Sequence, residues 1–99
     1  MHSLFFLHKY DNEKLILDYL NTALKLAKKS NYKKGLTLTY MYFGYFYEDH
    51  GDYSKALSNY LICLEMQQSE GNKKGIAKSF DNIGNVYSNQ GNYSEVLKK

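Results

Sequence analysis

The sequence repeats itself at a spacing of 40 residues, and this feature constrains the fold more than any other. Residues 31–59 match residues 71–99 without a gap at nine of 29 positions, where chance would give about two. A period of this length is typical of repeat proteins, in which each repeat forms one supersecondary unit that packs on its neighbours. The identical pairs include Gly44 with Gly84, Tyr47 with Tyr87 and Gly51 with Gly91.

A weaker copy of the repeat precedes these two. Leu17 aligns with Leu57 and Leu24 with Leu64 when the same spacing of 40 is applied. Other aligned pairs are apolar on both sides: Ile16 with Ala56, Leu20 with Tyr60, Ala23 with Cys63, and Leu26 with Met66. At 99 residues the chain is long enough for one domain. We therefore divide a single domain, 1–99, into a partial repeat 1–30, a full repeat 31–70 and a partial repeat 71–99.

The apolar residues within each repeat have helical spacing. Leu36, Tyr40, Phe43 and Tyr47 recur at intervals of four, three and four, which places them on one helix face. Short segments with glycine, such as residues 50–52 and 90–92, have the composition of turns between helices. The pattern predicts an all-α fold with helices over 3–10, 13–29, 33–49, 53–69 and 73–89, followed by a short stub over 93–98.

Two glycines fall inside predicted helices. A glycine in a helix costs about 1 kcal/mol relative to alanine, so Gly44 and Gly84 need a shared reason. We expect close approach of a neighbouring helix, since only a missing side chain lets two backbones come together. A phosphate-binding loop would instead need a preceding strand and clustered glycines, which the sequence lacks.

The repeat resembles the tetratricopeptide repeat. The family pattern of an aromatic residue, Leu-Gly, Tyr, and later Ala and Phe is met by Tyr40, Phe43-Gly44, Tyr47, Ala56 and Tyr60. The period of 40 and the segments 71–77 and 82–87 are similar to Leu-Gly-Asn repeat adaptors, kinesin light chains and bacterial regulators. The helix-ending proline of the family is missing. The resemblance implies a right-handed superhelix of antiparallel helix pairs whose inner wall, built from the first helix of each pair, binds a peptide or protein.

The resemblance also suggests a setting. We expect a cytoplasmic adaptor module, belonging to a longer bacterial repeat protein. The alternative is a regulatory or sensory module that controls a signalling enzyme or a transcription regulator. Either function depends on the side chains that do not belong to the core-facing side of each helix.

The predicted binding face draws on two helices. On helix 33–49 the leftover positions are partly aromatic, which favours contact with a peptide or a partner helix, although such residues can also pack on adjacent helices. On helix 73–89 they are polar, and Asn85 resembles an asparagine that binds peptide backbone in the family; a solvated face is the other interpretation. The candidate partner-binding residues are Leu38, Met41, Tyr42, Tyr45, Glu48, Lys78, Asp81, Asn82, Asn85 and Asn89.

A second surface is expected to mediate self-association. The core face of helix 73–89 has a covering partner on one side only, because few residues follow that helix. Repeat arrays normally cover such a face with a capping helix. We therefore expect this 99-residue form to be a homodimer, most simply a two-fold one that uses its C-terminal helices or exchanges one of them. The residues expected at that contact are Ile76, Phe80, Ile83 and Tyr87.

Composition argues against other functions. All 13 basic residues are lysine and the net charge is only +3, so nucleic acid is not an expected partner. No apolar run reaches the roughly 20 residues of a membrane span, so no membrane contact is expected. The single cysteine, Cys63, sits on an apolar helix face and is expected to be buried. No catalytic triad, metal-ligand cluster or cofactor motif is recognisable, so we expect no enzyme, no metal and no cofactor.

Overall fold

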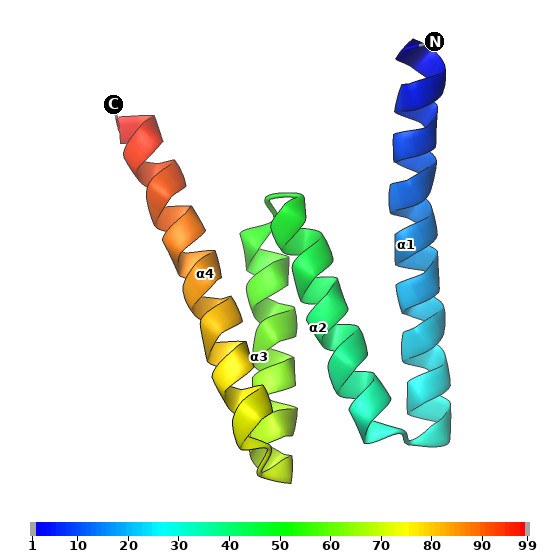
Figure 1. Cartoon of the computed structure of the whole chain (residues 1–99), viewed down its shortest axis with the longest axis vertical. Coiled ribbons are helices and arrows are strands. Elements are labelled where there is room, and N and C mark those ends of the chain that lie inside the picture. Colours follow the sequence, from blue (N-terminus) through cyan, green and yellow to red (C-terminus); the bar gives the residue numbers. More distant parts are fainter. Residues whose placement is uncertain (1, 99) are drawn as a thin grey trace. The chain divides into compact units, whose positions relative to one another are not determined.

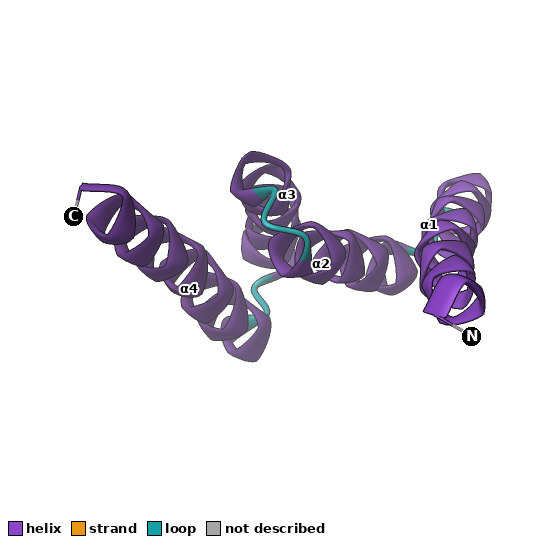
Figure 2. Cartoon of the chain, turned by 90° about the horizontal axis from the view of Figure 1, so that it is seen from above, coloured by secondary structure: helices purple, strands orange, loops and turns teal. Residues whose placement is uncertain are grey.

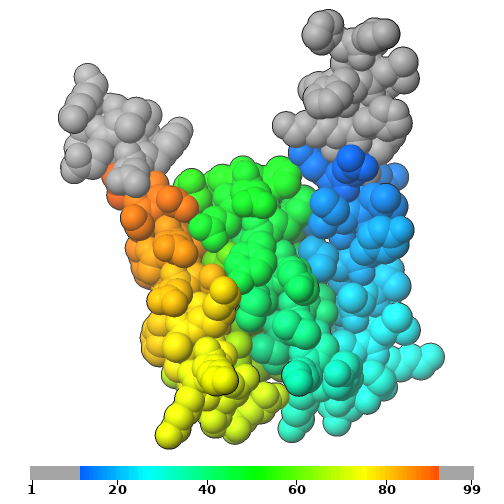
Figure 3. Space-filling view, in the orientation of Figure 1, coloured from blue at the N-terminus to red at the C-terminus, as the bar shows by residue number. Residues whose placement is uncertain are grey.

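The computed structural model describes the backbone of residues 2–98 and the side chains of residues 12–91, and the described backbone is helical apart from three short turns (Figures 1 and 2). Figure 3 draws in colour the residues whose side chains are described. The prediction of an all-α protein is therefore confirmed for this part of the chain. The helices are α1 (His2–Ser30), α2 (Lys33–Asp49), α3 (Tyr53–Glu70) and α4 (Lys73–Lys98).

Two of the predicted helix boundaries are wrong. Residues 11–12 lie inside α1, so the expected helices 3–10 and 13–29 are one helix. Residues 90–92 lie inside α4, so the stub 93–98 is not a separate element. A glycine or asparagine permits a helix to end but does not impose an end, since its cost of about 1 kcal/mol or less can be offset by the residues around it.

The other predicted turns are confirmed, and they share one backbone conformation. The turns after α1, α2 and α3 each contain a residue with left-handed φ: Asn31 at 54°, Gly51 at 76° and Gly71 at 69°. At the second and third of these turns, the residue before the next helix then acts as a cap. The Asp52 carboxylate accepts from the Lys55 amide at 3.2 Å, and the Asn72 side chain accepts from the Gly75 amide at 3.0 Å. Each cap satisfies one amide that the first helical turn leaves unpaired.

The chain divides into two compact units, Met1–Thr39 and Tyr40–Lys99, with the boundary inside α2. The first unit holds α1 and the first turns of α2. Ala27, Thr37 and Thr39 are its buried residues among those described. The hydroxyls of Thr37 and Thr39 donate to the carbonyls of Lys33 and Gly35 at 3.0 and 2.7 Å, so neither buried hydroxyl lacks an acceptor.

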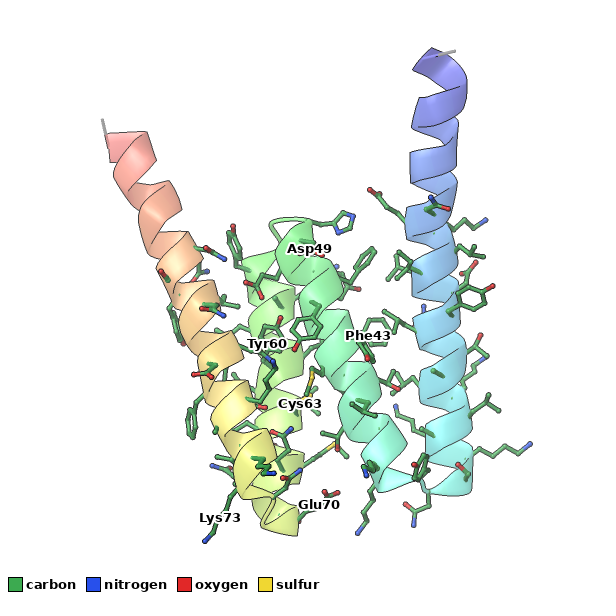
Figure 4. The ribbon with its side chains drawn as sticks, in the orientation of Figure 1. Phe43, Asp49, Tyr60, Cys63, Glu70 and Lys73 are labelled. Atoms are coloured by element: carbon green, nitrogen blue, oxygen red, sulfur yellow. The ribbon has the colours of Figure 1, made fainter. Side chains whose placement is uncertain are left out.

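The second unit has its core where α3 meets α4 and the rest of α2. Ala56, Tyr60 and Val86 are fully buried and form one cluster. Five partly buried residues pack around them: Tyr45, Tyr47, Tyr53, Leu57 and Ile83. Tyr60 lies near the middle of α3, as Figure 4 shows, and belongs to this core rather than to the surface.

A polar pair is buried between α3 and α4. Gln67 is 2% exposed and Ser79 is 1% exposed, and the Ser79 hydroxyl donates to Oε1 of Gln67. Burying such groups is unfavourable unless they bond to each other. Among the described residues no buried side-chain nitrogen or oxygen is left without a hydrogen bond.

The two repeat-equivalent glycines have different surroundings. A Cβ added at Gly44 would lie 2.8 Å from Cζ of Tyr60 and nearer still to two other atoms of that ring. The expected close approach is therefore confirmed at Gly44, although the neighbour is a side chain rather than backbone. At Gly84 the same addition meets no atom within 4 Å, so the expectation of close contact is wrong there. α3 covers Gly44, whereas no described helix covers Gly84.

Candidate functional site

The predicted binding residues of α2 and α4 lie side by side within the second unit. Nδ2 of Asn82 is 3.4 Å from the Tyr45 hydroxyl, and Nδ2 of Asn89 donates to Oε2 of Glu48 at 3.1 Å. These pairs join residues 37 and 41 positions apart in the sequence. The first helices of two successive repeats therefore contribute to one face.

Some of these residues serve the fold as well as the face. Asn82 is 6% exposed and therefore buried, which corrects the expectation that it faces a groove or solvent. Tyr45 is half-buried, and its ring packs edge-on against Tyr60 with centroids 5.8 Å apart. Glu48 is also half-buried. We assign these three residues to the floor of the face.

The exposed part of the face combines an aromatic ring with polar groups. Tyr42 is 53% exposed and contacts Tyr45 edge-on, with centroids 6.1 Å apart. Asp81, Asn85 and Asn89 are exposed on α4 at intervals of four, which places them on one stripe of the helix. We call Tyr42, Asp81, Asn85 and Asn89 the α2–α4 surface.

Three further candidates lie away from this surface or beside it. Met41 is half-buried and Lys78 is exposed. Leu38 is 44% exposed, but it belongs to the first unit, Met1–Thr39. It is therefore not counted in the α2–α4 surface.

Sequence reasoning missed the part that Tyr60 plays beneath this face. Its hydroxyl donates to Oε1 of Glu48 at 2.7 Å, so one carboxylate bridges Tyr60 and Asn89. Burial raises the pKa of Tyr60 well above its usual value, and the hydrogen bond to Glu48 raises it further. The available signal was Gly44, because a close neighbour is one reason for a glycine inside a helix.

The residues expected at a self-association contact are only partly covered. Phe80 is 54% exposed and Tyr87 is 57% exposed, while Ile76 and Ile83 are half-buried. The buried side of α4 is instead formed by Ser79, Asn82 and Val86. An apolar strip with Gly84 at its centre is thus open on α4.

The described residues have the following features that bear on chemistry. They contain no group of three His, Cys, Asp or Glu side chains that could hold a metal ion. Cys63 is buried as expected, and burial raises the pKa of its thiol to about 12. The thiolate, which is the nucleophilic form, is therefore scarce at neutral pH. No helix within the described part of the chain is long and apolar enough to cross a membrane.

Comparisons with protein-family models, with curated proteins and with solved structures find no match for this chain. The likeness to tetratricopeptide repeats therefore depends on the residues of the sequence alone.

Proposed function

We propose that this chain is a tetratricopeptide-like module that binds a peptide or a protein on the α2–α4 surface. The observation that carries the proposal is the pairing of Tyr45 with Asn82 and of Glu48 with Asn89. These contacts join the first helices of successive repeats into one face. In the proposed arrangement the helix pairs stack as a right-handed superhelix and this face is its inner wall.

The chemistry of the surface suits an extended peptide or a short helix with an apolar side chain. The exposed Tyr42 ring offers apolar area together with a polar hydroxyl, a combination common at protein interfaces. The exposed amide of Asn85 can donate and accept at once, as a peptide backbone requires. The Asp81 carboxylate adds a preference for a basic or amino group nearby.

A peptide selection tests the proposal without a known partner. Peptides are selected from a random display library against the wild-type chain, and the best binder is titrated by calorimetry. We expect Tyr42→Ala and Asn85→Ala each to weaken this peptide at least about tenfold, as truncation of central interface residues does. Tyr45 is less suitable for this test, because it packs on Tyr60 and its loss would also affect folding.

Leu61→Ala is the matched control. Leu61 is an exposed apolar residue of α3 at 47% exposure, and it lies outside the α2–α4 surface. Its replacement should leave binding unchanged. Equal affinities for the wild type, Tyr42→Ala and Asn85→Ala, or a loss caused by Leu61→Ala alone, would place the binding site elsewhere.

A further inference from the structure

The repeat allows each open helix face to be compared with an equivalent face that is covered. On α4, Phe80, Gly84 and Tyr87 are exposed. Their equivalents in α2, which are Tyr40, Gly44 and Tyr47, are half-buried or buried. The difference has a visible cause, because α3 places the Tyr60 ring against Gly44. The strip on α4 is thus a copy of a surface that receives a helix.

α1 shows the converse difference. Ile16 is 46% exposed and Ala23 is exposed, whereas their equivalents in α3, Ala56 and Cys63, are fully buried. Leu20, the equivalent of Tyr60, is half-buried. The open side of α1 is extended by further apolar residues, which are Leu15 at 47%, Tyr19 at 66% and Leu26 at 61% exposure. α1 therefore presents a copy of the surface that covers α2.

We propose that α1 of one copy of this chain packs against α4 of a second copy, as α3 packs against α2 within each copy. Leu20 of one copy then takes the place at Gly84 that Tyr60 takes at Gly44. This inference depends on the repeat and on residue exposure, and it does not require the α2–α4 surface to bind a partner.

The polar pairs of the α2–α3 contact provide an independent argument. Within one copy, the Tyr60 hydroxyl donates to the Glu48 carboxylate. At the proposed contact the equivalent residues are Leu20 and Ser88, so the hydroxyl donor and the charged acceptor are both replaced. A carboxylate at 88 facing leucine would be costly to bury without a partner. The joint replacement is what a contact between these two helices requires.

A second pair changes in the same coordinated way. The Lys55 amine lies 5.3 Å from the centroid of the Tyr47 ring across the α2–α3 contact. The equivalent residues at the proposed contact are Leu15 and Tyr87, both exposed in the single chain. A leucine that packs against a tyrosine ring forms an apolar contact, which is stabilised by burial. A lysine at the same position would be well solvated without any such contact.

The proposed contact joins two different surfaces. Each copy carries one α1 face and one α4 face, so the contact is heterologous and leaves one further face open at each end. Copies would therefore add head to tail until the array closes or stops. A two-fold contact between α4 helices, the simpler expectation from the sequence, would instead stop at two copies.

Two charge variants with complementary defects test the proposal. Ile16→Glu disables the α1 face and Phe80→Glu disables the α4 face; both sites are exposed, so folding should be retained, as helix content by circular dichroism will check. In sedimentation at tens to hundreds of micromolar, the wild type should exceed twice the mass of one 11.6 kDa copy. Each variant alone should sediment as a single copy. An equimolar mixture should form one heterodimer and nothing larger, because only one intact contact can form.

Leu61→Glu serves as the control and should assemble like the wild type. A wild type that remains a single copy at every concentration overturns the proposal. So does an Ile16→Glu variant that still dimerises while Phe80→Glu does not, because that result indicates a two-fold contact between α4 helices. Peptide binding on the α2–α4 surface is measured separately with Tyr42 and Asn85, so the two proposals can fail independently.

Discussion

The Tyr60 hydroxyl donates a 2.7 Å hydrogen bond to Glu48, while the ring of the same tyrosine lies against Gly44. One α3 side chain thus contacts α2 at two places, through a polar group and through its apolar ring. The second oxygen of Glu48 accepts from Asn89, which ties α4 to the same carboxylate. Tyr60 therefore links α3 to α2, and Glu48 links both to α4.

Tyr60→Phe should lower the free energy of unfolding by about 1–2 kcal/mol, because a hydrogen bond to a charged acceptor is lost while the ring remains. Urea unfolding monitored by circular dichroism measures the change. Tyr19→Phe is the control, since Tyr19 is 66% exposed. If Tyr60→Phe matches this control, the bond to Glu48 contributes nothing to stability.

Replacing Gly44 or Gly84 by alanine should change the free energy of unfolding in opposite directions, although the two positions are equivalent in the repeat. Gly44→Ala should destabilise by about 1–3 kcal/mol, because the added methyl group overlaps the Tyr60 ring. Gly84→Ala should stabilise by up to about 1 kcal/mol, because the methyl group meets open space and alanine favours the helix. Midpoints of urea unfolding, measured under conditions where the chain is a single copy, compare the two. Changes of equal sign would contradict the difference in their surroundings.

Asp52 caps the N-terminus of α3, and its replacement should lower the stability of the folded chain. Asp52→Ala should cost about 1 kcal/mol, because the Lys55 amide loses its side-chain acceptor. The ion pair between Lys55 and Asp52, at 3.9 Å and exposed to solvent, adds little. Asp52→Asn should restore most of the loss, since it keeps an acceptor without the charge. Thermal unfolding of the two variants separates the cap from the charge.

The free energy of unfolding should decrease at alkaline pH because Cys63 is buried. The thiol has a pKa near 9.0 when exposed and near 12 in the folded chain, so above pH 9 the unfolded state loses a proton that the folded state keeps. The stabilising contribution is complete below pH 9, and it declines by at most about 1.4 kcal/mol per pH unit up to pH 12. Tyr60 acts in the same direction above pH 10.

Cys63→Ala tests this pH dependence. The variant should lose some stability at every pH because it leaves a small cavity. Its further loss between pH 7.5 and pH 10 should be about 1.4 kcal/mol smaller than that of the wild type. An identical alkaline decline in both proteins would show that the thiol does not contribute to it.

The sequence alone could predict the central part of the fold. Helices 33–49 and 53–69 were predicted with their true starts, because helical spacing of apolar residues and capping groups both act within a few residues. Turns were also expected at residues 11–12 and 90–92, but both segments are helical. Their helical structure could not be predicted in this way. Whether a helix ends at a glycine depends on what the following segment packs against, and local residue types do not contain that information.

The candidate site was predicted unevenly for a related reason. The repeat placed Tyr45, Glu48, Asn82 and Asn89 on one predicted face, and the structure brings Asn82 to Tyr45 and Asn89 to Glu48. The repeat could not indicate that Asn82 is buried or that Glu48 accepts from Tyr60. A small rotation of α4 about its own axis decides which of two neighbouring residues is buried, and spacing at 3.6 residues per turn does not fix that rotation.

The buried pair of Gln67 and Ser79 has a consequence for how α3 and α4 can slide along each other. An apolar contact between two helices tolerates a shift of one helical turn, about 5.4 Å. After such a shift, apolar side chains still pack against other apolar side chains. A shift of that size here would move the Ser79 hydroxyl away from Oε1 of Gln67 and leave both groups unpaired in the interior. The pair therefore selects a single axial alignment of the two helices, much as a lone buried asparagine sets the register of a coiled coil.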